Sequence, residues 1–176
     1  MMTAVATKLP KSIRNLDLSG IRSKLIDDDD GLGWTEAQAD EGLKWYRRFL
    51  FLSRKYTEPE IQLVPMRFID EVWHQHIQDT KAYLAACNTV FGAFMHHDPY
   101  FGVGPGGEER LEAAGQATNE LFVEEFGESP RDTIVFGNGE FAAQMGKSHG
   151  CSHDGHSSRY AFEKLISHGF VNEFTS

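Results

Sequence analysis

Apolar residues recur at the three- and four-residue spacing of an amphipathic helix over most of the chain. The capping-box pattern Thr35-Glu36-Ala37-Gln38 marks the start of one such segment. Gly92 and Gly127 follow the last apolar positions of two others, where glycine typically ends a helix. The pattern predicts one or two short helical turns over residues 13–26 and longer helices over 35–56, 66–91 without interruption, and 108–126.

Charged and turn-forming residues separate these segments. The acidic run 27–30 is typical of a solvated linker, and the stretch 96–107, rich in glycine and proline, predicts a long loop. Because no segment shows sustained strand alternation, we expect an all-α fold, a small helical bundle with a long Gly/Pro loop and an irregular His-rich C-terminal tail. Residues 1–147 are expected to form a single helical domain and 148–176 a flexible tail, in which residues 160–166 could form a short terminal helix.

Charge and cysteine content exclude several classes of protein. The 176 residues carry 17 Lys+Arg against 26 Asp+Glu, a formal net charge of −9. This balance opposes binding to nucleic acid or to an anionic membrane. Two cysteines cannot form a disulfide framework, and the chain has neither an N-terminal apolar segment nor a run of apolar residues long enough to span a bilayer. We therefore expect a cytoplasmic protein that binds neither nucleic acid nor membrane, with its oligomeric state left open.

Histidine is the residue type that stands out in the composition, with eight in the chain and seven of them between residues 74 and 156. In the 66–91 segment, His76 lies in the apolar stripe and His74 lies about 160° around the helix from it. Two histidines so placed cannot bind one ion on a regular helix. Cys87 cannot join His76 either while the helix is continuous, because eleven residues rise about 16.5 Å. Further ligands must therefore come from elsewhere in the chain.

A mononuclear metal site is the first arrangement open to these histidines. His76 and Asp79, three residues apart on one helix, would be joined by His96 or His97 from the Gly/Pro loop. Three nitrogen and oxygen ligands with an open fourth position are typical of catalytic zinc.

Two other arrangements remain open. Glu71-x-x-His74 could form one arm of a di-iron or di-manganese site, with carboxylates from the other helices, namely Glu41 and Glu112 or Glu120. Alternatively no metal binds: His76 is then a hydrogen-bonded core residue, and His74 forms a surface pair with Asp70.

The C-terminal tail offers a separate set of ligands. Cys151, His153 and His156 have the spacing Cys-x-His-x-x-His, and a thiolate with imidazoles suits zinc or copper. The same tract could instead be a disordered linker, or it could deliver ligands to the helical site.

A resemblance to a known family rests on the motif Asp-x-x-Trp-His-x-His, with a tyrosine seven residues beyond the second histidine. Together with Tyr46-x-x-Phe-Leu, Leu63-Val-Pro65 and His97-x-Pro99, this motif resembles the bacterial glycine-rich domain-containing proteins over roughly residues 20–127. The resemblance implies no settled activity. It marks six positions for testing: Asp70, Trp73, His74, His76, Tyr83 and His97.

These observations lead to two hypotheses of function. The favoured one is a metal-binding helical protein, a metalloenzyme acting on a small molecule or peptide, with zinc as its metal and iron or copper as alternatives. Asp70 or Glu71 would orient an imidazole or act as general base, and Tyr83 would supply a phenolic donor. The alternative is a non-catalytic helical protein-interaction module whose histidines are structural.

Overall fold

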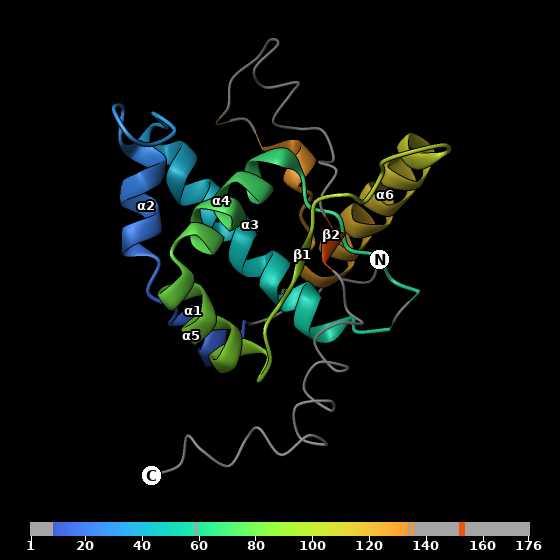
Figure 1. The fold of residues 1–176 in the computed structure, drawn as a ribbon, viewed down its shortest axis with the longest axis horizontal. Helices are drawn as coiled ribbons and strands as arrows, with labels where there is room; N and C mark the ends of the chain where they lie inside the picture. The colour runs from blue at the N-terminus through green and yellow to red at the C-terminus, as the bar shows by residue number, and fades with distance from the viewer. Residues whose placement is uncertain (1–8, 59, 134, 136–151, 154–176) are drawn as a thin grey trace.

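Six α-helices dominate the part of the chain that the structure, a computed structural model, describes: residues 9–58, 60–133, 135 and the backbone of 152 and 153 (Figure 1). Strand is confined there to one pair of two-residue strands, so the predicted all-α fold is confirmed. The helices are α1 (Lys11–Arg14), α2 (Ser19–Ile26), α3 (Glu36–Lys55), α4 (Arg67–Gln78), α5 (Thr80–Val90) and α6 (Gly107–Phe126), the strands are β1 (His97–Asp98) and β2 (Ser152–His153), and a 3₁₀ turn, η1, spans Pro130–Asp132.

Helix α3 begins at the predicted capping box. Thr35 Oγ1 accepts a hydrogen bond from the Gln38 amide at 3.3 Å, and Gln38 Oε1 accepts one from the Thr35 amide at 2.9 Å. The helix packs against α2 and α4 and buries Trp45, Tyr46 and Phe49 almost completely. Because α4 packs its apolar residues against this face, its rotation about its own axis is fixed.

The helix predicted over residues 66–91 is interrupted, which corrects the sequence prediction. Helix α4 ends at Gln78 and α5 begins at Thr80, with Asp79 between them at φ −84° and ψ 76°. The Asp79 carboxylate accepts a hydrogen bond from the Ala82 amide at 3.1 Å and so caps α5. An aspartate that satisfies a helix-start amide lets the chain turn without glycine or proline, and the apolar periodicity does not reveal this.

The Gly/Pro stretch after α5 contains strand β1. This strand pairs antiparallel with β2, so that His97 lies opposite His153 and Asp98 opposite Ser152. In the view of Figure 1 the two strands lie side by side, with α6 beyond them. The backbone of Ser152 and His153 thus pairs with the loop that carries His97.

The last predicted helix is confirmed as α6, and Gly127 ends it at φ 69°, a conformation that favours glycine. Phe122 packs edge-on against Trp45 of α3, with ring centroids 5.2 Å apart. The Val64 amide donates to Thr118 Oγ1 at 2.9 Å. The first contact attaches α6 to α3, and the second attaches it to the segment that leads into α4.

Several predicted features lie outside the described residues. These are the domain boundary after residue 147, Cys151, His156 and the terminal helix over 160–166. None of the described helices is long and apolar enough to cross a membrane.

Candidate metal centre

One carboxylate and two imidazoles converge where α4 faces β1. His74 Nε2 lies 2.9 Å from His97 Nε2 and 3.4 Å from Asp70 Oδ2. His97 Nε2 lies 3.5 Å from Asp70 Oδ1. Asp70, His74 and His97 each offer one potential metal-ligand atom, and these three atoms lie within 4.8 Å of one another. We call Asp70, His74 and His97 the triad.

The triad combines a helical pair with a residue far along the chain. Asp70 and His74 are one turn apart on α4, a spacing that places two side chains on the same face of a helix. His97 is 23 positions beyond His74. The Asp70 side chain is 0% exposed, that of His97 14% and that of His74 31%. The carboxylate therefore forms the inner end of the triad, and His74 forms its outer end.

A chain of buried hydrogen bonds holds the segment that carries His97. Trp73 Nε1 donates to the Tyr83 hydroxyl at 3.0 Å, and this hydroxyl donates to the Met95 carbonyl at 2.5 Å. The His97 ring also packs edge-on against the Trp73 ring, with centroids 4.7 Å apart. The backbone two residues before His97 is thus attached to α4 through α5, and contacts within the protein position the imidazole.

The triad geometry fits a small divalent ion. Bonds of about 2.0–2.2 Å to imidazole nitrogen and carboxylate oxygen put neighbouring ligand atoms about 3.3 Å apart in a tetrahedral sphere. The separations of 2.9, 3.4 and 3.5 Å within the triad lie around this value. Two imidazoles and one carboxylate suit zinc or iron, and three protein ligands leave at least one coordination position open.

A pocket of about 490 Å³ adjoins the triad. Its α4 wall includes the polar residues Glu71, His74 and Gln78, which lie on one face of the helix, and also Ile77. The facing wall is formed by the segment that ends in β1 and includes Phe94 and His97. Buried Asp70 does not line the pocket, so an ion in the triad would have Asp70 behind it and the pocket in front.

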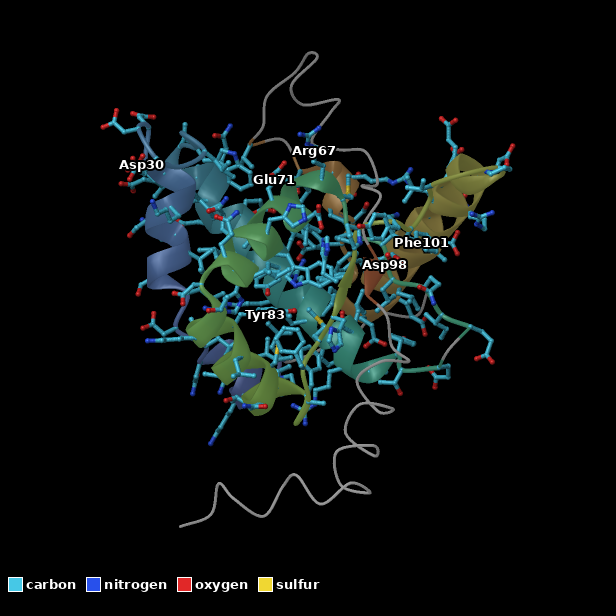
Figure 2. All side chains as sticks on the ribbon, viewed as in Figure 1. Asp30, Arg67, Glu71, Tyr83, Asp98 and Phe101 are labelled. Atoms are coloured by element: carbon cyan, nitrogen blue, oxygen red, sulfur yellow. The ribbon has the colours of Figure 1, made fainter. Side chains whose placement is uncertain are left out.

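Glu71 contributes a carboxylate to this pocket. Its Oε1 accepts from Arg67 Nε at 3.2 Å, and Figure 2 shows the two side chains close together near one end of α4. The ion pair keeps the Glu71 carboxylate at the pocket wall, beside His74 and outside the triad. The structure thus places one carboxylate in the triad and a second one at the wall of the pocket.

His76 lies away from the triad, in the core. The Tyr46 hydroxyl and His76 Nδ1 are 2.9 Å apart, and the His76 ring packs edge-on against Tyr83. Burial raises the pKa of Tyr46, so its hydroxyl keeps its proton and donates to the ring. Burial also lowers the pKa of His76 and so favours the neutral ring. A hydrogen bond with the Ala82 backbone acts in the opposite direction but has the smaller effect on this pKa. His76 thus has the position that the metal-free alternative of the sequence analysis gave it, that of a hydrogen-bonded core residue.

The break at Asp79 also changes the relation between His76 and Cys87. Both line one small internal pocket, because α5 turns and packs beside α4 instead of continuing it. The sequence analysis excluded Cys87 from a site with His76 because it assumed one continuous helix, and this assumption was wrong. Burial raises the pKa of the Cys87 thiol, which favours the protonated form and a packing role.

Other predicted site residues have distinct positions. Asp79 caps α5, and His96 lines the pocket without belonging to the triad. Tyr83 lines the pocket as well, but burial raises its pKa strongly, so it is a neutral hydrogen-bond donor. The carboxylates of the di-metal hypothesis are not brought together: Glu41 binds Trp45 Nε1 at 2.7 Å, and Glu112 and Glu120 are exposed on α6.

One family model matches the chain. It is described as UCP032817-like and covers residues 12–110, more than half of the 176 residues and all of the triad. The chain belongs to the UCP032817-like family. The resemblance to the glycine-rich domain-containing proteins was therefore wrong. Comparison with curated proteins and with solved structures gives no match.

Membership of the UCP032817-like family supplies no activity, because the family is an uncharacterised one. What can be said of this UCP032817-like chain therefore rests on its own geometry. The sequence analysis assigned Asp70 to the orientation of an imidazole or to a general base, and it did not count Asp70 among the metal ligands. Its spacing of four residues from His74 was the signal that the two could face one ion.

Proposed function

We propose that this UCP032817-like protein binds one divalent metal ion through Asp70, His74 and His97. The observation that carries the proposal is the convergence of three ligand atoms within 4.8 Å of one another, from two elements that are far apart in the sequence. Both Nε2 atoms and the carboxylate contribute to this convergence.

Zinc is the metal that we propose, with iron and copper as the alternatives. Imidazole and carboxylate together suit zinc and iron, and imidazole suits copper. When bound, an ion with an open position would act as a Lewis acid and would make a bound water more acidic. The buried Asp70 carboxylate offsets part of the charge of the ion in a region from which water is excluded.

We further propose that the site is that of a metalloenzyme whose substrate, a small molecule or peptide, enters the adjoining pocket. The pocket lining contains a carboxylate, Glu71, and no lysine or arginine among the described residues. A neutral or cationic substrate fits this charge, and the aromatic ring of Phe94 offers it an apolar wall. Glu71 would accept a proton there. The compartment we propose is the cytoplasm, where the thiol of Cys87 stays reduced.

The experiment is metal analysis of protein purified without an affinity tag, followed by zinc titration. We expect one bound ion per chain. Asp70→Asn keeps the shape of the side chain but removes its charge. We expect it to weaken zinc binding by at least about tenfold, because the loss of a residue that only hydrogen-bonds to a metal ligand already weakens binding by about tenfold to a hundredfold. Glu71→Gln is the matched control, since it changes a neighbouring carboxylate outside the triad; its zinc affinity should stay near that of the wild type.

A metal-free wild type that zinc and chelator leave unchanged would refute this function. It would favour the second candidate, a non-catalytic interaction module. The observation in favour of that candidate is the exposure of Tyr100 (76%) and Val103 (66%) on the loop before α6. The interaction module would be supported if Tyr100→Ser abolished the binding of a protein partner while Asp70→Asn left that binding unchanged.

A further inference from the structure

The pocket beside the triad differs in chemistry between its two ends. On its α4 wall, Glu71, His74 and Ile77 follow one another at intervals of three residues, and each interval rises about 4.5 Å along the helix axis. The triad histidine is therefore the middle position. A carboxylate lies toward the start of the helix from it, and an aliphatic side chain lies toward the end.

Phe94 lies at the aliphatic end of the pocket. Its ring packs edge-on against Tyr83, with centroids 5.3 Å apart, and Tyr83 packs edge-on against His76, the neighbour of Ile77. His96 contacts the Phe94 ring as well, with centroids 4.8 Å apart. Phe94 is thus held by two rings while 38% of it stays exposed, and it lines the pocket. An aromatic surface that is fixed in advance binds an apolar group without a further loss of side-chain freedom.

We propose that the pocket binds a carbonyl compound with an apolar side chain, such as an apolar residue of a peptide. Its carbonyl oxygen would face the metal ion, and its side chain would lie against Ile77 and Phe94. The inference rests on the proposed metal binding and deepens it, because it names the class of substrate and the direction in which the substrate binds. An ion with an open coordination position polarises a carbonyl. Burial of the side chain at the apolar end then adds affinity.

The difference between the two ends sets the direction of binding. Glu71 and Tyr83, which mark the ends, lie well apart in Figure 2. A substrate in the reverse direction would place its apolar side chain against the Glu71 carboxylate and would remove water from that charge, which is unfavourable. The apolar side chain is therefore directed toward Phe94.

The test uses two zinc-binding probes on the full-length zinc-loaded protein. Acetohydroxamic acid and phenylpropanohydroxamic acid share the group that binds zinc, and only the second carries a phenyl ring. We expect the second to bind at least about tenfold more tightly, as measured by calorimetric titration, because its ring is buried at the apolar end. Phe94→Ala should remove most of this preference and leave the affinity for acetohydroxamic acid unchanged.

Tyr100→Ala is the matched control. It removes an exposed aromatic ring a few residues farther along, at a position that does not line the pocket, and it should keep the preference. Phe94→Gln, which keeps a long side chain but makes its end polar, repeats the test if Phe94→Ala does not fold.

The outcomes separate this inference from the proposed metal binding. If the wild type binds zinc and both hydroxamic acids with equal affinity, the metal site stands and the apolar end of the pocket is refuted as a binding site. A preference that persists in both Phe94 variants, or that Tyr100→Ala also removes, would refute the assignment to Phe94. If the wild type binds no zinc, both proposals fail.

Discussion

The two histidines of α4 differ in their surroundings more than their separation of two residues suggests. His74 reaches the triad with about a third of its side chain exposed, whereas His76 is 1% exposed beneath Tyr46 and Tyr83. Helix geometry predicts this divergence, since positions i and i+2 point to nearly opposite faces. The exclusion of a shared site on a regular helix therefore agrees with the structure. The sequence did not reveal that His97 of β1 lies against the face with His74, or that Tyr46 of α3 lies against the face with His76.

A substitution at Tyr46 tests the core role of His76. Tyr46→Phe removes the hydroxyl that donates to His76 Nδ1 and leaves a buried nitrogen without this donor, so we expect a loss of about 1–3 kcal/mol in the free energy of unfolding. Zinc stoichiometry should not change. Urea unfolding and metal analysis provide the two measurements. Tyr100→Phe, at an exposed tyrosine, should stay within about 0.5 kcal/mol of the wild type. Loss of the metal from Tyr46→Phe would assign His76 to the metal site instead.

At the level of elements, the junction between α4 and α5 was the main error of the sequence prediction. Apolar positions continue in helical phase through residues 66–91, and a periodicity analysis has no means of detecting one non-helical residue among them. The capping ability of Asp79 was the available signal, but the pattern contains neither glycine nor proline there. The consequence concerns the site, because the turn lets Tyr83 reach both Trp73 and Met95.

The cap itself can be tested with a pair of variants. Asp79→Ala removes the acceptor for the Ala82 amide, and we expect it to lower the free energy of unfolding by about 0.5–2 kcal/mol. Asp79→Asn retains an acceptor oxygen and should lose only a small part of this. Chemical unfolding of the two variants side by side decides the matter. Equal losses would show that the negative charge of Asp79 matters and that the capping geometry does not.

For the whole molecule, the sequence predicted the fold class better than the site. Amphipathic spacing and the capping box were sufficient for the all-α fold, because both are local signals. The triad depends on His97 meeting α4 across 23 positions, a long-range contact that the turn at Asp79 and the anchored Met95 produce. Neither the partner of His97 nor the β1–β2 register has a local signature in the sequence.

Metal binding to the folded state should stabilise the entire chain. An ion that binds only the native protein adds about 2.7 kcal/mol when its concentration is one hundred times the dissociation constant. We expect zinc to raise the midpoint of thermal unfolding accordingly, and His74→Ala to remove the effect. The stabilisation should shrink as the pH is lowered, because metal ligands must be deprotonated and metal binding releases protons. An increase that persists in His74→Ala would point to a different zinc site.

The distance along the chain between His74 and His97 has a consequence for the unfolded state as well. An ion that bridges them closes a loop of 23 positions around the whole of α5. A covalent cross-link of similar span removes enough chain entropy from the unfolded ensemble to stabilise a protein by about 3 kcal/mol. A chain with two cysteines would thus obtain from its histidines what other small proteins obtain from a disulfide, in a form that a chelator can reverse without any change of redox state.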